Sequence, residues 1–190
     1  MTHHAHHDCL PSLAADIRLF GPVGSQMLGE FLRQQSDAPE GKPLVLELST
    51  EGGDADTARR IAQEIRLMQA VHGREVFFLG KTYVYSAGVT IMGAVPCARR
   101  FLTHDTQLLI HERKLRRELH LDGPLSTCAS ILRNALEEVE AGQRLERTGF
   151  EELVEGCNLD VEALLAKVLD QDWYLDADMA ERLGLVRGLV

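Results

Sequence analysis

Ser86 stands where a strand gives way to a helix, a position suited to nucleophilic chemistry. It follows Tyr83-Val84-Tyr85 and precedes a small residue, a glycine and a run of apolar residues typical of a buried helix. A serine at a helix start is most often a cap, yet its hydroxyl can also attack a carbonyl group if a base removes its proton. The local pattern leaves both roles open.

A histidine follows another predicted strand, 25 residues after Ser86. His111 comes directly after Leu108-Leu109-Ile110. Because the imidazole group titrates near neutral pH, a histidine at a strand end can serve as a general base at a cleft. His104, beside Asp105 in a predicted turn, is the rival base, and a purely structural role for His111 is the alternative.

A glycine pair ends a third predicted strand. Gly52-Gly53 follows the apolar stretch 44–48, at a strand-to-helix turn. Glycine there permits positive φ and close approach of a ligand, and the backbone N–H groups of such a turn can bind an oxyanion. The pattern is not GxGxxG and no phosphate-loop lysine follows, so it does not indicate a nucleotide site. A plain tight turn explains the pair equally well.

The hydrophobic pattern predicts the elements that position these residues. Strands are expected at 17–20, 44–48, 75–79, 99–102 and 107–110, with helices from 25, from 54, over 86–95, from 124, from 160 and through 179–183. Alternating strands and helices favour an α/β domain with a largely parallel sheet. The helix after Pro124 carries an apolar stripe (Leu125, Ala129, Leu132, Leu136, Val139) and is expected to lie outside that sheet.

Composition and charge exclude several classes of protein. The chain is 45% hydrophobic and 26% charged, which is typical of a globular domain and not of a disordered one. A net charge of −9 argues against nucleic acid and anionic membranes as partners. The uncharged stretch 82–98 is too short and too rich in glycine to span a bilayer.

The cysteines and the N-terminus point to a reducing compartment. Cys9, Cys97, Cys128 and Cys157 show no metal-binding spacing, so four free thiols, no metal and no cofactor are expected. Residues 1–15, with four histidines and no apolar signal region, are expected to form a flexible segment of a cytoplasmic protein.

Residues 16–190 resemble the proteolytic subunit of Clp protease, a family of S14 serine peptidases with a crotonase-like fold. The likeness is carried by Asp16-Ile-Arg-Leu-Phe-Gly-Pro-Val23, Leu48-Ser-Thr-Glu-Gly-Gly53, Ser86-Ala-Gly88, Leu109-Ile-His111, Asp170-Gln-Asp-Trp-Tyr-Leu-Asp-Ala177 and Ala180-Glu-Arg-Leu-Gly-Leu-Val186. The first five stretches are similar to the family's first strand, glycine turn, nucleophile turn, histidine strand and acid-bearing segment, in that order. The last is similar to the family's C-terminal motif.

The resemblance implies a serine endopeptidase with a Ser-His-Asp triad. Ser86 would be the nucleophile, His111 the base and Asp172 the acid, with Asp170 as the alternative acid. The backbone N–H groups of Gly53 and Ala87 would form the oxyanion hole.

The resemblance also implies an α/β head with a protruding handle over about 112–150, inside a single domain 16–190. It implies a homo-oligomer built on rings, peptide or unfolded-protein substrates and a Clp-type ATPase partner. The chain departs from the family after His111, where the charged stretch 112–118 replaces a glycine-rich strand that supports peptide binding and ring stacking.

Three other functions are compatible with parts of this pattern. One is a non-catalytic scaffold that keeps the fold, which the presence of all three triad residues argues against. Another is a crotonase-fold enzyme acting on acyl thioesters, which would not need Ser86, His111 and Asp172 together. A Ser-Lys peptidase is disfavoured, because the chain has only four lysines and no evident membrane anchor.

Overall fold

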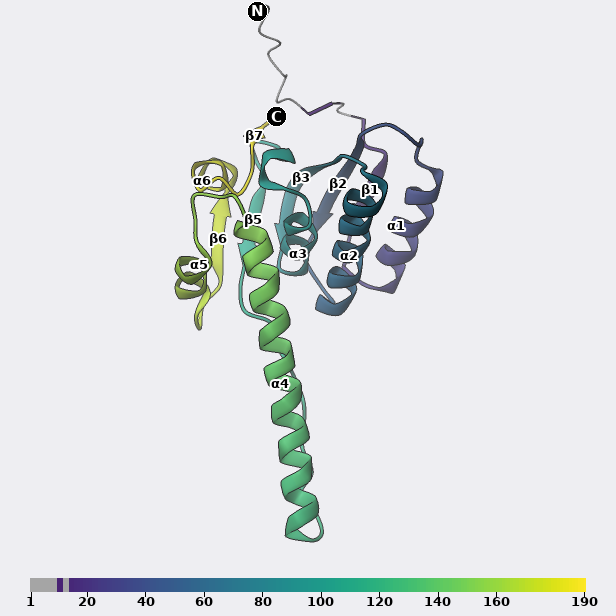
Figure 1. The fold of residues 1–190 in the computed structure, drawn as a ribbon. Coiled ribbons are helices and arrows are strands. Elements are labelled where there is room, and N and C mark those ends of the chain that lie inside the picture. The colour runs from purple at the N-terminus through teal and green to yellow at the C-terminus, as the bar shows by residue number, and fades with distance from the viewer. Residues whose placement is uncertain (1–9, 12–13) are drawn as a thin grey trace, which may run out of the picture.

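The structure is a computed structural model that describes residues 10–11 and 14–190 (Figure 1). The predicted flexible segment 1–15, including its four histidines, lies mostly outside the described residues. The rest of the chain alternates strands and helices, as the hydrophobic pattern predicts.

The sheet is mainly parallel. Its strands are β1 (Ile17–Phe20), β2 (Leu44–Thr50), β3 (Val76–Tyr85), β4 (Arg100–Leu102), β5 (Gln107–Ile110), β6 (Trp173–Asp176) and β7 (Gly188–Leu189). The strand order is β1-β2-β3-β4-β7, while β5 pairs with the carboxyl half of β3 and β6 pairs antiparallel with β5. The long strand β3 therefore joins two parts of the sheet.

Helices pack against this sheet. They are α1 (Ser25–Asp37), α2 (Ala55–His72), α3 (Ala87–Gly93), α4 (Leu125–Val154), α5 (Val161–Val168) and α6 (Ala177–Arg182), with a short 3₁₀ helix η1 (Cys97–Arg99) after α3. The helix predicted from residue 160 is α5, and the Asp160 side chain caps it by accepting a hydrogen bond from the Ala163 N–H.

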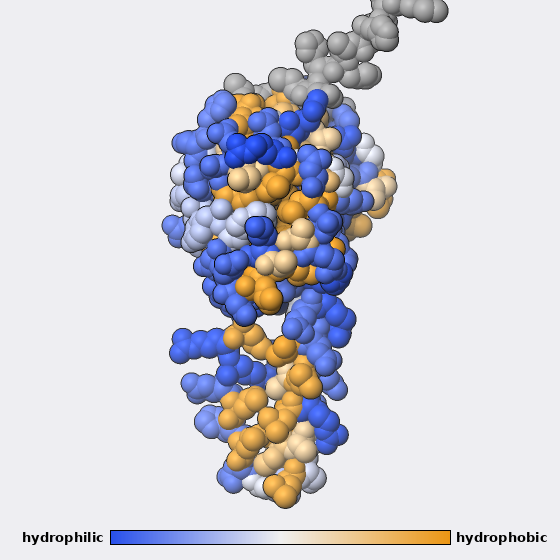
Figure 2. Space-filling model, turned by 90° about the vertical axis from the view of Figure 1, so that its left-hand side faces the viewer, coloured by the Kyte–Doolittle hydropathy of each residue, from blue (hydrophilic) through white to orange (hydrophobic). Residues whose placement is uncertain are grey.

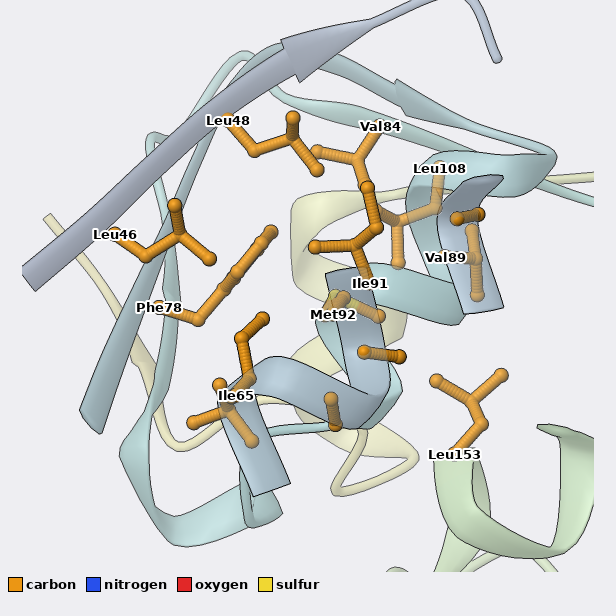
Figure 3. Close-up of a cluster of buried hydrophobic side chains, with 14 of the residues drawn as sticks. Leu46, Leu48, Ile65, Phe78, Val84, Val89, Ile91, Met92, Leu108 and Leu153 are labelled. Atoms are coloured by element: carbon orange, nitrogen blue, oxygen red, sulfur yellow. The ribbon is translucent and has the colours of Figure 1, made fainter. Parts of the chain in front are cut away.

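The main core lies between the sheet and the helices α2 and α3. Leu46, Leu48 and Phe78 point from the sheet toward Ile65 of α2 and Ile91 of α3 (Figure 3). Successive residues of a strand face opposite sides of the sheet, so Val45 and Leu79 lie on the face away from Leu46 and Phe78. A smaller apolar cluster forms there. That cluster contains Leu10, Val45, Leu79 and Phe101.

Helix α4 is longer than predicted and projects far beyond the sheet (Figure 1). It runs through Gly149, which the sequence pattern treats as a break. Phe150, Leu153 and Val154 bury its last turn against the core, and this burial outweighs the roughly 1 kcal/mol that a glycine costs inside a helix. Pro124 precedes the first helical residue instead of occupying the first turn.

Two strands were not predicted from sequence. β6 and β7 are four and two residues long, and their residues show no clear alternation of polar and apolar types. They are strands because β5 and β4 supply hydrogen-bonding partners, which a local pattern does not reveal.

A buried arginine ties the base of α4 to the sheet. The Arg100 side chain is 1% exposed and donates hydrogen bonds to five backbone carbonyl groups. These belong to Gly93, Val95, Glu152, Leu153 and Leu185. Several lie at the C-terminal ends of α3 and α4, where carbonyl groups lack helical partners and a positive charge is favourable.

We expect Arg100→Met to destabilise the fold by about 3 kcal/mol or more, because five buried carbonyl groups would lose their donors. Urea unfolding followed by circular dichroism measures the change. Arg99→Met is the matched control: Arg99 is partly exposed and pairs with Glu75, so its loss should cost about 1 kcal/mol or less. Equal losses for the two variants would contradict the assignment.

Within the described chain, no helix combines the length and apolar character needed to cross a lipid bilayer.

Candidate active site

The parallel strands bring three predicted site segments to one edge of the sheet. β2, β3 and β5 are neighbours and end at the same side, so the residues that follow them lie close together. Gly53, Ser86, Ala87 and His111 all line one cleft of about 830 Å³. His104 precedes β5 and so lies toward the opposite end of that strand, which removes it as the rival base.

Ser86 occupies a strained turn between β3 and α3. Its φ of 53° and ψ of −114° are rare for a residue with a side chain. Its N–H donates to the Leu109 carbonyl oxygen at 2.8 Å, which fixes the turn against β5. A sharp strand-to-helix turn of this kind can present a serine hydroxyl to a cleft, as the nucleophile elbow does in α/β-hydrolases.

The glycine turn after β2 needs glycine at both positions. A Cβ at Gly52 would lie 2.8 Å from the Ser86 Cβ, and one at Gly53 would lie 2.3 Å from the Val23 carbonyl oxygen. Thr50 shapes the turn, since its Oγ1 accepts the Gly52 N–H at 3.1 Å and donates to the Gly21 carbonyl oxygen at 2.7 Å. The sequence reading missed this role of Thr50.

The proposed oxyanion donors face the cleft without an acceptor. Among the hydrogen bonds of the described residues, none is donated by the backbone N–H of Gly53 or of Ala87. The neighbouring N–H groups of Gly52 and Ser86 are both occupied. Gly53 and Ala87 line the same cleft as Ser86, and N–H groups without an acceptor are what binding a developing oxyanion requires.

The His111 ring is held in one tautomer by its own chain. Its Nδ1 lies 2.6 Å from the Glu112 carbonyl oxygen, and because a carbonyl group only accepts, Nδ1 carries the proton. The other nitrogen, Nε2, is then free to accept a proton. Within the described residues, no hydrogen bond joins the ring to Ser86 or to Asp172.

Asp172 lies beside His111 in the strand register but not in the cleft. The last pair of the β5–β6 ladder is Ile110 with Trp173, so His111 and Asp172 are the next opposite positions. The Asp172 carboxylate turns away, with Oδ1 3.4 Å from the Lys114 Nζ, and its side chain is 44% exposed. His111 and Asp172 therefore lie next to the last strand pair, but their side chains bind other partners.

The segment after His111 is bound to the turn that carries Asp172. The Glu112 carboxylate accepts the Asp170 N–H at 3.1 Å, and Lys114 pairs with Asp172. Glu112 and Lys114 thus both contact the segment 170–172. We call these two contacts the 112–114 clasp. Sequence reasoning missed it because only tertiary pairing brings 170–172 here.

Helix α4 forms the far wall of the cleft. Glu146 accepts a hydrogen bond from the Arg113 backbone N–H, and burial raises the pKa of the Glu146 carboxyl above its ordinary value. Arg59 and Arg66 pair with Glu152 near the base of the helix. Val89, Phe150 and Leu153 supply apolar surface between these charges. No cluster of potential metal ligands occurs in the described residues.

Comparison with known structures defines the class of fold. A mutant of ClpP1 from Listeria monocytogenes superposes with a TM-score of 0.67 over 92% of this chain and 91% of that chain, at 18% identity. The α/β head and the long helix α4 therefore have the fold of this ClpP1 chain, as the resemblance implied.

Sequence comparison extends this likeness to the family. The chain is 23% identical over 176 residues to the ATP-dependent Clp protease proteolytic subunit 3 of Rhizobium etli, covering 92% of this chain and 82% of the relative. It is 28% identical over 177 residues to proteolytic subunit 2 of Treponema pallidum, covering 92% and 81%. No family model matches the sequence. Over most of its length, the chain is thus similar to ClpP proteolytic subunits.

Proposed function

We propose that this protein is a serine endopeptidase that hydrolyses peptide bonds with Ser86, His111 and Asp172. The Ser86 turn carries the proposal. A strained serine opens onto a cleft shared with His111 and with two N–H groups that have no acceptor among the described residues. This combination suits acyl transfer, because nucleophile, base and oxyanion donors must lie within one reacting volume.

The chemistry follows the triad scheme. His111 Nε2 takes the proton from the Ser86 hydroxyl as the oxygen attacks the peptide carbonyl carbon. The Gly53 and Ala87 N–H groups stabilise the negative oxygen that forms. His111 then protonates the leaving amine, and a water molecule, activated by the same imidazole, releases the acyl group from Ser86.

Asp172 requires a change of partner before it can orient His111. In the resting arrangement, the Glu112 carbonyl oxygen occupies Nδ1, and Lys114 holds the Asp172 carboxylate. His111 and Asp172 directly follow and precede the last β5–β6 pair, Ile110 with Trp173, so we propose that side-chain rotation with release of the 112–114 clasp joins them. An extended peptide entering the cleft beside 111–115 is the proposed trigger.

Lys114→Gln tests this resting arrangement. Removing the ammonium group should raise kcat/KM for a short peptide by up to about 5-fold at low salt, because an exposed ion pair contributes on the order of 1 kcal/mol. Added salt should activate the wild type and leave the variant unchanged. Lys167→Gln, on the exposed face of α5, is the control. Lower activity in Lys114→Gln would show that Lys114 assists catalysis.

A fluorophosphonate probe separates peptidase activity from the two alternatives. A serine with an activated hydroxyl reacts covalently at phosphorus, whereas a scaffold or an acyl-thioester enzyme without a nucleophilic serine does not. Peptide mapping of the labelled full chain should find the adduct at Ser86. Absence of labelling, with the fold intact, would favour the scaffold or thioester reading.

We also propose a homo-oligomer in which α4 contributes to an interface. The apolar stripe predicted on this helix is exposed in the single chain: Leu125 is 87% exposed and Leu136 57%. Figure 2 shows apolar side chains gathered along the projecting part of the molecule. A surface of this kind is unusual on a monomer, and the relatives are named as subunits.

Light scattering tests the oligomer. The full chain at micromolar concentration should have a mass several times 21.1 kDa, and Leu132→Ser/Leu136→Ser should lower it. Leu169→Ser removes an exposed leucine from a site outside α4 and should leave the mass unchanged. A wild-type mass near that of one chain at all concentrations would contradict the proposal.

The similarity to ClpP subunits supports a proposal for the partners and the location. We propose unfolded polypeptides as substrates, a Clp-type ATPase as the protein that delivers them, and the cytoplasm as the compartment. The names of the relatives, which describe ATP-dependent proteases, support the ATPase.

A further inference from the structure

Two cysteines from distant parts of the sequence meet at one turn. Cys97 opens η1, just after α3, and Cys157 lies three residues beyond the end of α4. The Cys97 thiol donates a hydrogen bond to the carbonyl oxygen of Gly156, the residue directly before Cys157, at 3.3 Å. The fold thus brings together two thiols about 60 residues apart in the chain.

The glycine directly before Cys157 packs closely against the Cys97 thiol. A Cβ at Gly156 would lie 3.3 Å from the Cys97 sulfur, and Gly156 adopts a φ of 75°. Cys157 donates to the Leu153 carbonyl oxygen at 3.4 Å. Both thiols are reduced and partly exposed, so a small oxidant can reach them.

The surroundings make the two thiols unequal. Burial raises the pKa of Cys157 to about 11; the Arg100 guanidinium opposes this rise and the neighbouring Cys97 thiol adds to it. Cys157 therefore remains a protonated thiol at neutral pH. Since the thiolate is the form that attacks an oxidant, we do not assign the first oxidation to Cys157; its role is the second step, in which its proton leaves with the displaced hydroxyl group.

We propose that Cys97 and Cys157 form a reversible disulfide when the protein meets a peroxide. The Cys97 sulfur attacks one oxygen of hydrogen peroxide, breaking the O–O bond and giving a sulfenic acid and water. The Cys157 sulfur then displaces the hydroxyl group from that sulfenic acid, which forms the S–S bond and releases a second water. Two thiols and one peroxide thus give one disulfide and two waters, and a dithiol reverses the change.

The bond would fix the end of α4 to the segment that follows α3. These two segments already meet at Arg100, whose donors reach Gly93 and Val95 on one side and Glu152 and Leu153 on the other. Closing a loop that contains all of α4 restricts the unfolded chain, so the oxidised protein should be more stable. Reversible bonds of this kind are those that occur in reducing compartments, where permanent disulfides are rare.

The experiment treats the full chain with hydrogen peroxide in a Cys9→Ser/Cys128→Ser background. Intact mass should fall by about 2 Da, because two thiol hydrogens are lost, and peptide mapping should find Cys97 joined to Cys157. Dithiothreitol should restore the mass. The melting temperature should rise by at least about 5 °C on oxidation and return on reduction.

Two further variants give the controls. Adding Cys97→Ser or Cys157→Ser to that background should abolish both the 2 Da loss and the rise in melting temperature. Sulfinic acid at Cys97 without a cross-link, or disulfides between chains only, would overturn the proposal. None of these measurements uses peptidase activity, so their outcome is separate from the proposed function.

Discussion

Ser86→Ala is expected to abolish peptide hydrolysis. Removing the nucleophile of a serine triad lowers the rate by roughly 10⁴–10⁶, and the remaining activity comes from binding and oxyanion stabilisation. Fluorophosphonate labelling should disappear with it. The measurement is kcat/KM on a fluorogenic peptide together with mass analysis of the labelled protein.

The fold of Ser86→Ala needs its own check, because the residue occupies a strained turn. Both serine and alanine carry a Cβ at the same positive φ, so the melting temperature should change little. Ser36→Ala on the exposed face of α1, where the hydroxyl donates to the Arg33 carbonyl oxygen, is the matched control and should keep full activity. Peptidase activity that survives in Ser86→Ala would assign the nucleophile elsewhere.

Asp172→Asn is expected to lower kcat by roughly 10⁴ while leaving the fold intact. An amide in place of the carboxylate neither stabilises the imidazolium ion nor holds the ring in the tautomer that receives the Ser86 proton. Because Asp172 is exposed and its only side-chain partner within the described residues is Lys114, the substitution should have little effect on stability.

Asp170→Asn is the matched control and the test of the alternative acid. Asp170 has a φ of 57°, a conformation that asparagine adopts readily, so this turn should persist. The β5–β6 register sets Asp172 and not Asp170 opposite His111, so Asp170→Asn should keep near wild-type activity. If Asp170→Asn is the damaging change and Asp172→Asn is silent, the acid is Asp170.

Local patterns in the sequence were enough to predict most of the sheet and the candidate residues. Continuous apolar runs identified β2 and the first half of β3, and the cap at Asp160 identified the start of α5. The glycine pair, Ser86 and His111 were each placed at the end of a predicted strand, and the structure shows that these strands are parallel neighbours. These features depend on residues close in the chain, whose pattern is visible without the fold.

The strand β6, the contacts of Arg100 and the turn that holds Cys97 and Cys157 depend on tertiary structure. β6 is a strand only because β5 is beside it, and that register is what sets Asp172 across from His111. The sequence does not distinguish Arg100 from other charged residues. In the fold, five backbone carbonyl groups accept hydrogen bonds from its side chain. The packing of the end of α4 near Arg100 also brings Cys97 to the turn before Cys157. The contacts of Arg100 with Leu153 and Leu185, and of Cys97 with Gly156, join residues about 50 to 90 positions apart, so no local periodicity encodes them.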